Sequence, residues 1–292
     1  TGEDTLSLHD ALPIYSDTVG AVTLSSGSIT GTTGVLTATS YSVTNAGTST
    51  ITAAIAGTNA TFTKSGAGTL TLSGANTYTG ATTISAGTLL QTGSLSSSTD
   101  VVMTNAAIWD LQASQTVASL TMASGNSIAN STGTSSLVVS GTSALANSIT
   151  TSGVQTYTGA VTLLADTSLT TTDAAVTFSS GVTGSGKALT VNAGSGAINM
   201  NAVGVSGTSV GAVVLNSTGV TTLDGAVYAA SVTTNAGGSV AINTTTVTTT
   251  GAQTYNDAVT LGTDTTLSTT SNGNVVFAST VNGAQGLTIA TH

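Results

Sequence analysis

Cysteine and arginine are absent from this 292-residue sequence, and proline occurs once. Without cysteine the chain has no disulfide, no thiolate zinc ligand and no thiol nucleophile. The two basic residues, Lys64 and Lys187, stand alone, so no row of cations is available to neutralise a run of phosphates. The composition therefore excludes nucleic-acid binding, a basic membrane-surface helix and a phosphate clamp.

Charged residues make up 4% of the chain and aromatic residues 3%. Threonine, serine and glycine together supply nearly half of it. Disordered segments share this richness in small polar residues, but they are poor in apolar residues and rich in charge. Here hydrophobic residues make up 39%, and the mean hydropathy is positive. We therefore expect a folded chain, either one or two domains or a single repeat array.

The first fourteen residues differ from the rest, because they contain the only proline (Pro13), the only glutamate (Glu3) and one of the two histidines (His9). Residues 5–14 resemble the in-frame translation of a sequencing adaptor, so we interpret residues 1–14 as a non-native, adaptor-like head. The alternative is a genuine short amphipathic helix or linker. The sequence shows neither a signal peptide nor an apolar run of membrane-spanning length. If the head marks the edge of an assembled sequence, we expect both true termini to lie beyond it.

A short pattern of three to five alternating β-formers, followed by Gly, Asn, Ser or Asp, recurs from Val19 onward. Examples are Ala21–Leu24, Thr69–Leu72 and Ala160–Leu163. Alternation of apolar residues with threonine is the period of a strand, and β-branched residues suit a pleated surface. Glycine interrupts almost every window that a helix would need. The pattern predicts an all-β chain with almost no helix.

Longer repeats are also present. Residues 153–172 align with residues 251–270 at an offset of 98, and thirteen of the twenty positions are identical. A third, earlier copy begins at Asn76. Such repetition indicates a solenoid, in which each coil stacks on its neighbours.

A parallel β-helix also explains the scarcity of charge. Equivalent residues of successive coils lie about 4.8 Å apart, and like charges stacked at that distance repel one another. We predict one elongated rod with coils of roughly 20 residues, hence about 13 or 14 coils. We expect residues 15–150 and 151–292 to be two stretches of this β-helix, the second with the 98-residue repeat.

Residues 64–89 resemble the autotransporter-associated β-strand repeat of bacterial passenger regions nearly residue for residue. The second half, with Gln253-Thr-Tyr255 and Gly273–Phe277, is similar to the repeats of filamentous haemagglutinin-like exoproteins. The resemblance implies a right-handed parallel β-helix that is exported across the outer membrane and displayed at the bacterial cell surface or released.

The same resemblance implies a non-catalytic stalk that supports adhesion or biofilm formation. Its partners would be a host or abiotic surface, glycans or other cells, together with an outer-membrane translocator outside this sequence. The family's secretion signal, translocator barrel and two-partner secretion domain are all missing here. Autotransporter and two-partner export therefore both stay open.

Enzymatic chemistry is weakly represented. The pairs Asp166 with Asp173 and Asp257 with Asp264 are similar to glycosidase dyads or to the Asp clusters of β-helical polysaccharide lyases. Lyases also need a cation to stabilise their intermediate, and the chain has no arginine. We therefore expect these carboxylates to serve turns and caps. We assign no catalytic, cofactor-binding or metal-binding residue, and a polysaccharide lyase or hydrolase is the alternative function.

Two further patterns have a binding interpretation. Thr69-Leu-Thr71 and Thr248-Thr-Thr250 suggest an ice-binding threonine ladder, but such triplets do not recur at coil spacing. Tyr78, Tyr157 and Tyr255 occupy the same place in three repeat copies and would bind sugars if they formed an exposed row. We expect them instead to pack at a coil corner or between coils, and we expect Trp109 to be buried. Both expectations favour a scaffold.

Overall fold

The computed structural model describes residues 6–8, 12–13 and 15–292. Within these ranges all regular structure is β, and no helix occurs. Contacts divide the chain into two compact units, residues 1–140 (unit 1) and 141–292 (unit 2). Both are β-solenoids of parallel strands, and together the described residues make about 14 turns. The predicted all-β solenoid is confirmed.

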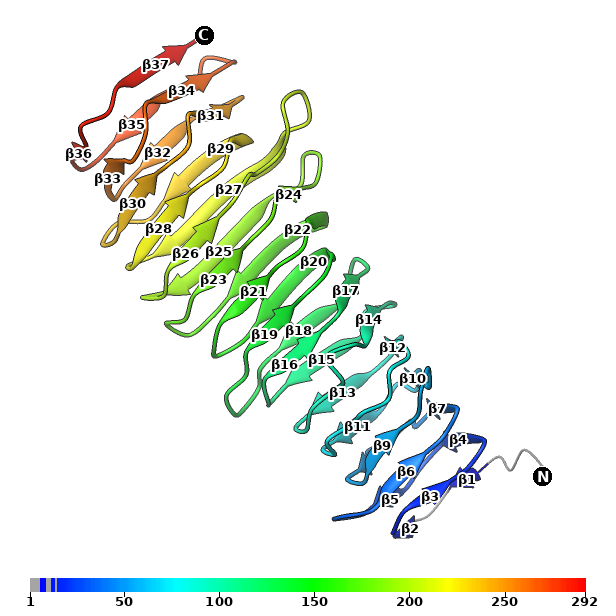
Figure 1. Cartoon of the computed structure of the whole chain (residues 1–292). Coiled ribbons are helices and arrows are strands. Elements are labelled where there is room, and N and C mark those ends of the chain that lie inside the picture. Colours follow the sequence, from blue (N-terminus) through cyan, green and yellow to red (C-terminus); the bar gives the residue numbers. More distant parts are fainter. Residues whose placement is uncertain (1–5, 9–11, 14) are drawn as a thin grey trace. The chain divides into compact units, whose positions relative to one another are not determined.

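Unit 1 is built from short strands that stack coil on coil (Figure 1). The strands are β1 (Leu6–Leu8), β2 (Leu12–Pro13), β3 (Asp17–Thr18), β4 (Ala21–Leu24), β5 (Ser28–Thr30), β6 (Val35–Thr37), β7 (Ser40–Val43), β8 (Ser49–Ile51), β9 (Ala54–Ala56), β10 (Thr61–Lys64), β11 (Thr69–Leu72), β12 (Thr82–Ile84), β13 (Thr88–Gln91), β14 (Asp100–Met103), β15 (Ile108–Leu111), β16 (Gln115–Val117), β17 (Ser119–Met122), β18 (Ser127–Ala129) and β19 (Leu137–Val139).

These strands form three rows. The first row runs through β1, β4, β7, β10, β12, β14 and β17. The second runs through β2, β5, β8, β11, β13, β15 and β18. The third contains β3, β6 and β9 and, further along the chain, β16 and β19. Each coil thus contributes one segment to each row.

Unit 2 has the same plan (Figure 1). Its strands are β20 (Ser143–Thr150), β21 (Gln155–Tyr157), β22 (Val161–Thr170), β23 (Val176–Phe178), β24 (Val182–Thr183), β25 (Leu189–Gly194), β26 (Ile198–Met200), β27 (Val210–Ser217), β28 (Val220–Leu223), β29 (Val227–Thr234), β30 (Ser239–Ile242), β31 (Thr246–Thr249), β32 (Gln253–Tyr255), β33 (Ala258–Leu261), β34 (Thr265–Thr269), β35 (Val275–Phe277), β36 (Val281–Asn282) and β37 (Leu287–Thr291).

Its three rows are defined by the pairing register. The first row is β21, β23, β26, β28, β30, β33 and β36. The second is formed by the later halves of β20, β22 and β29 with β25, β27, β32 and β35. The third is formed by the earlier halves of the same three strands with β24, β31, β34 and β37. Side chains that bond across coils are separated by 19 residues in some places and 24 in others, in agreement with the predicted coil length.

Alternation places the core inside each coil. In β4 the side chains of Val22 and Leu24 are buried while Ala21 and Thr23 are partly exposed. The register then stacks Val22 on Tyr41 of the next coil and Tyr41 on Phe62 of the coil after it. Each fully buried Val, Leu, Ile or Phe side chain contributes roughly 1.5–3 kcal/mol. The apolar and threonine alternation therefore supplies both strand geometry and core.

The predicted boundaries stand as follows. Strands β1 and β2, within the predicted head, pair in parallel with β4 and β5. Residues 1–5, 9–11 and 14 of that head lie outside the described residues, and its non-native origin stays a prediction. The contacts divide the chain after Ser140. The predicted boundary near residue 150 marks instead where the 98-residue sequence repeat begins, so one boundary describes packing and the other describes sequence similarity.

Candidate functional site

Lys64 is the first residue of the passenger-type segment 64–89, and its side chain points into unit 1. Its side chain is 0% exposed, and Nζ donates hydrogen bonds to the carbonyl oxygens of Gly66 and Ala86. Burial lowers the pKa of this amine below its ordinary value. The lysine thus ties a corner of its own coil to the corner of the next coil.

The same corner requires glycine. A Cβ at Gly66 would lie 2.0 Å from the carbonyl oxygen of Asn45, and one at Gly68 would lie 1.9 Å from that of Gly47. Those distances are far shorter than any van der Waals contact. The Gly-Ala-Gly sequence after Lys64 is therefore a condition for coils to stack closely at this corner.

Asn76 lies in the third row of unit 1, between β9 and β16, where its backbone N–H donates to the carbonyl of Ser94 at 3.0 Å and its side chain adds further hydrogen bonds between coils. It is 2% exposed. Its Oδ1 accepts from the backbone N–H of Ile55 at 3.2 Å, and its Nδ2 donates to the carbonyls of Gly74 and Ser94 at 2.9 and 3.0 Å. Gln115 does the same on a later coil, accepting from Leu95 N at 2.9 Å. We call this arrangement an amide clamp, because one buried amide bonds the backbone of neighbouring coils.

Unit 2 contains two further amide clamps, in the copies of the 98-residue repeat. Gln155 Nε2 donates to the carbonyls of Ile149 (3.2 Å) and Thr170 (3.0 Å). Gln253 Nε2 donates to the carbonyls of Val247 (3.1 Å) and Ser268 (2.9 Å). The Oε1 of each glutamine accepts from the hydroxyl of the tyrosine two residues later. The repeat therefore preserves a packing unit down to individual hydrogen bonds.

These two copies nevertheless lie in different rows. Gln155–Tyr157 forms β21 in the first row of unit 2, whereas Gln253–Tyr255 forms β32 in the second. An offset of 98 residues is thus not a whole number of coils. The same glutamine hydrogen bonds therefore form in either row.

The three repeated tyrosines are buried, as expected from packing. Tyr78, Tyr157 and Tyr255 are each 0% exposed. Tyr157 stacks on Phe178 and Tyr255 on Phe277, with ring centroids 5.3 Å apart in both pairs, and desolvation raises the pKa of all three phenols above 10. The alternative of an exposed, sugar-binding row formed by these residues is wrong.

Trp109 is also buried, at 0% exposure, as predicted. It lies on Leu89 of the preceding coil and under Ile128 of the following one. The indole therefore belongs to the core of unit 1.

The aspartates bond neighbouring coils. In each of seven, one or both carboxylate oxygens accept a hydrogen bond from another coil. The pairs are Asp100 with Ser119 Oγ (2.5 Å), Asp110 with Ser131 N (2.9 Å), Asp166 with Ala188 N (2.9 Å), Asp173 with Ser195 N (2.8 Å), Asp224 with Asn243 Nδ2 (2.8 Å), Asp257 with Gly238 N (2.7 Å) and Asp264 with Gly286 N (2.7 Å). Asp17 accepts from Thr18 N.

The suggested carboxylate dyads do not converge. The later half of β22 separates Asp166 from Asp173, and β33 separates Asp257 from Asp264. An extended strand rises about 3.3 Å per residue, so the strand residues between the two carboxylates hold each pair apart. The hydrogen bonds of these four aspartates reach residues 19 or 22 positions away on another coil and do not show the turn and cap role expected from the sequence.

The threonine triplets do not form a ladder. Thr71 pairs with Thr50 on one side and with Leu90 on the other. Thr248 pairs with Tyr228 and with Ser268. Each row of outward threonines is therefore interrupted within one or two coils.

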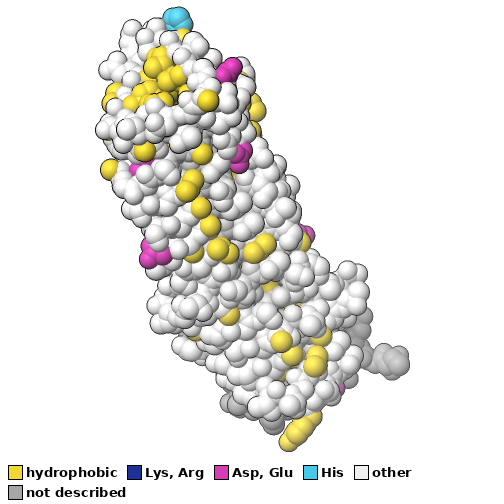
Figure 2. Space-filling view, turned by 60° about the vertical axis from the view of Figure 1, so that its left-hand side comes forward, with side chains coloured by type: hydrophobic (Ala, Val, Ile, Leu, Met, Phe, Trp, Pro, Cys, Tyr) yellow, Lys and Arg dark blue, Asp and Glu magenta, His cyan; other side chains and the backbone are white. Residues whose placement is uncertain are grey.

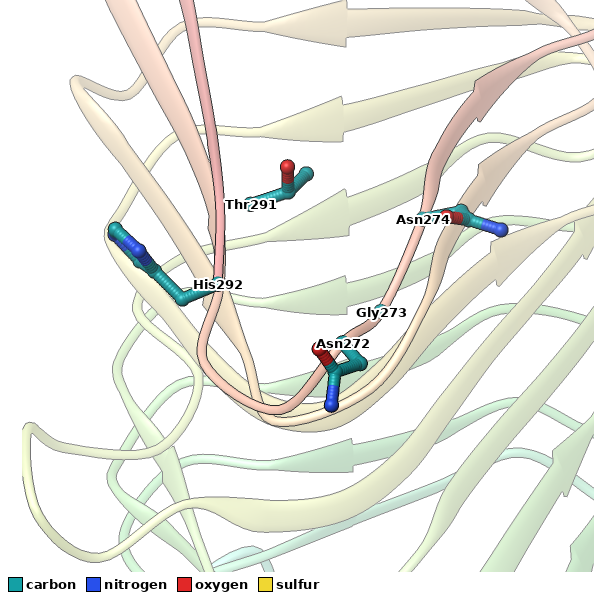
Figure 3. Close-up of a pocket in the computed structure, with 5 residues that line it drawn as sticks. All are labelled: Asn272, Gly273, Asn274, Thr291 and His292. Carbon is teal, nitrogen blue, oxygen red and sulfur yellow. The ribbon is translucent and has the colours of Figure 1, made fainter.

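One hollow of about 210 Å³ lies on the last coil of unit 2 and is lined by Asn272, Gly273, Asn274, Thr291 and His292. Figure 3 shows that the side chains of Asn272, Asn274 and His292 point in different directions. The backbone N–H of Asn272 donates to the carbonyl of His292. These groups do not converge on a common point, so the hollow lacks the geometry of a catalytic site.

A second groove, of about 340 Å³, lies on the third row of unit 2. Tyr228 of β29 and Thr248 of β31 form its floor with Thr270, and Ser206 and Ser209 come from the loop that precedes β27. Tyr228 is partly exposed. No sequence pattern indicates this groove, because its residues come from different coils. The one signal in the sequence is the segment 204–209, with Gly204 and Gly207, which lengthens one coil.

The surface is almost uncharged. Figure 2 shows a face dominated by uncharged polar side chains and backbone, with scattered acidic groups. Apolar side chains gather at the end of unit 2 near the histidine, where Val276, Val281 and Ile289 are 43%, 37% and 49% exposed.

The described residues contain neither a cluster of metal ligands nor a helix of membrane-spanning character. They contain no group of three or more His, Cys, Asp or Glu placed to hold a metal ion. No helix among them has the length and hydropathy to cross a membrane.

Comparison with known proteins identifies one repeat. Residues 62–90 match the family model of the passenger-associated-transport-repeat. No curated protein and no solved structure matches the chain. The matched repeat and the β-solenoid fit an autotransporter passenger repeat protein, and this repeat family implies an exported surface protein. The likeness of the second half to haemagglutinin-type exoproteins stays a prediction.

Proposed function

We propose that this chain is part of the passenger of a bacterial outer-membrane-associated surface protein, and that it serves as a non-catalytic stalk supporting adhesion or biofilm formation. The passenger repeat at 62–90 and the solenoid around it support export and display. Its partners are a host or abiotic surface, glycans or other cells, and a translocator outside this chain carries it across the outer membrane.

The observation that carries the non-catalytic part is how the carboxylates are used. Catalysis by acids and bases needs titratable groups that converge in a pocket. Here Asp166, Asp173, Asp257 and Asp264 each accept a backbone N–H of another coil. Their hydrogen bonds stabilise the stacking of coils, which is what a stalk requires.

Surface display tests the adhesive part. The chain is fused to an unrelated outer-membrane anchor in a bacterial strain without adhesins of its own, and retention on glass, on epithelial cells and in biofilm is measured. We expect retention above that of cells displaying an unrelated β-solenoid of similar length at equal surface density. Retention equal to this control would contradict an adhesive role.

Glycan turnover tests the non-catalytic part. The purified chain is incubated with pectin, alginate and host glycans, and the products are separated by mass. We expect no cleavage. Turnover that disappears in Asp166→Ala or Asp264→Ala would show that the chain is an enzyme.

A further inference from the structure

Three coils of unit 2 meet in the floor of the groove beside Tyr228. Tyr228 pairs with Thr248 on the next coil, and Thr248 pairs with Ser268 on the one after. Parallel neighbours lie about 4.8 Å apart, so their outward side chains form one line across the coils. The hydroxyls of Thr248 and Ser268 are 2.9 Å apart. Ser268 does not itself line the groove, whose lining combines the ring of Tyr228 with side-chain hydroxyls that include those of Thr248, Thr250 and Thr270.

The loop at 204–209 forms a fixed wall beside this floor. Gly204 has a φ of 67°, and a Cβ there would lie 2.1 Å from the carbonyl oxygen of Tyr228, so only glycine fits. Val205 and Thr208 exchange two backbone hydrogen bonds, of 3.3 and 2.9 Å, which close a tight turn. The carbonyl of Ser209 accepts from Gly186 N at 3.0 Å. A wall held by these bonds is formed before any ligand arrives, which lowers the entropic cost of binding.

Tyr228 differs from the tyrosines of the core. Tyr41, Tyr78, Tyr157 and Tyr255 are at most 1% exposed, and each hydroxyl has a hydrogen-bonding partner. Tyr228 is partly exposed on the outer side of the sheet, and no described residue hydrogen-bonds its hydroxyl. Its ring and its hydroxyl are both available to a ligand.

The chemistry of the groove selects the ligand class. None of the residues lining it is charged, so a phosphate, sulfate or uronate group would find no counter-charge. The strands beneath are already paired on both edges, which leaves no free edge for a peptide strand. An aromatic face packs against apolar C–H surface while hydroxyls donate and accept hydrogen bonds around it. A pyranose ring has both surfaces.

We infer that the groove beside Tyr228 binds a neutral oligosaccharide, with one sugar ring on Tyr228 and its hydroxyls on the side chains of Thr248, Thr250 and Ser206. A volume of about 340 Å³ lies at the lower end of the range of small-molecule pockets, which suits one or two sugar units. The inference rests on the proposed adhesive function and names its ligand.

Calorimetric titration of the full chain tests the inference. The probes are neutral tetrasaccharides of glucose, mannose and N-acetylglucosamine, with tetragalacturonate as the charged comparison. We expect at least one neutral probe to bind and tetragalacturonate not to bind. In Tyr228→Ala affinity should fall about tenfold or more, whereas Tyr228→Phe, which keeps the ring, should stay within about threefold.

Two further variants separate binding from folding. Thr248→Val removes one groove hydroxyl with little change in shape and should weaken binding, whereas Thr260→Val, an exposed outward threonine of β33, should leave it unchanged. Circular dichroism checks that each variant is folded. Failure of all neutral probes to bind, or unchanged affinity in both Tyr228→Ala and Thr248→Val, overturns the inference.

The display assay distinguishes the two proposals. If cells displaying the chain adhere and Tyr228→Ala cells adhere equally well to glycan-bearing surfaces, the adhesive function stands and the groove is not its site. If a neutral oligosaccharide binds at Tyr228 but displayed cells do not adhere, the groove stands and the adhesive function fails.

Discussion

Replacing Asn76 by leucine tests how much an amide clamp stabilises the stacking of coils. Leucine has a similar size but neither donor nor acceptor, so the three side-chain hydrogen bonds to the N–H of Ile55 and to the carbonyls of Gly74 and Ser94 are lost, while the Ser94 carbonyl keeps the backbone N–H of residue 76. A buried hydrogen bond contributes roughly 0.5–1.5 kcal/mol net. Three lost bonds therefore predict a loss of about 3 kcal/mol, a large part of the roughly 5–15 kcal/mol that stabilises a domain.

Trp109 offers a local probe for this measurement. It is the only tryptophan of the chain, it is buried, and it lies in the same unit as Asn76. Urea unfolding followed by its fluorescence should show a lower midpoint in Asn76→Leu. The matched control is Thr92→Val, an exposed position of the same unit, for which we expect a change within about 0.5 kcal/mol. If both variants unfold like the parent chain, the clamp does not stabilise this row and the reasoning is refuted.

Three more predictions follow from the interior of the solenoid. Burial raises the pKa of Tyr41 to about 12. A raised folded-state pKa gives stability that is complete below the unfolded pKa of 10 and is lost as pH rises towards 12. The part of the phenolate absorbance that Tyr41→Phe removes should therefore appear together with loss of β circular dichroism, and its appearance between pH 10 and 12 in a still-folded chain would contradict this. Gly66→Ala should destabilise unit 1 by about 1–3 kcal/mol in urea unfolding, because the new methyl group overlaps a backbone carbonyl of the previous coil. An unchanged urea midpoint would contradict this and show that the coil corner at Gly66 can relax. Gln155→Leu and Gln253→Leu should lower the stability of unit 2 by similar amounts, about 2–3 kcal/mol each, because the two amides make matching hydrogen bonds. The midpoints of thermal unfolding of the two variants should agree. A clear difference between them would mean that the effect of a clamp depends on its row.

Much of the fold could be read from local patterns. Alternation in segments such as Ala21–Leu24 fixes which side chains face inward, so strands, core and the absence of helix follow from neighbouring residues. The buried state of Trp109 and Tyr157 followed from their place in alternating, repeated segments.

Stacking could not be read in this way. Lys64 is interpreted from the sequence as an isolated basic residue. In the structure its side chain points inward, and carbonyl oxygens of two coils accept hydrogen bonds from its amine. Asn76 is interpreted from the sequence as the start of a repeat copy, whereas in the structure its side-chain amide bonds the backbone of the coils before and after it.

The sequence by itself determined that the chain is a β-solenoid of coils with little charge, because period-two alternation and the avoidance of stacked charge act on each residue and its coil-to-coil neighbours. Only the tertiary structure decided which residues become those neighbours. Coil lengths vary, and each difference shifts the register of every later coil, so two copies of one repeat lie in different rows and Tyr228 lies beside Thr248 and Ser206. The position of a binding groove on a solenoid therefore depends on the lengths of all the coils before it, and no local sequence pattern shows that sum.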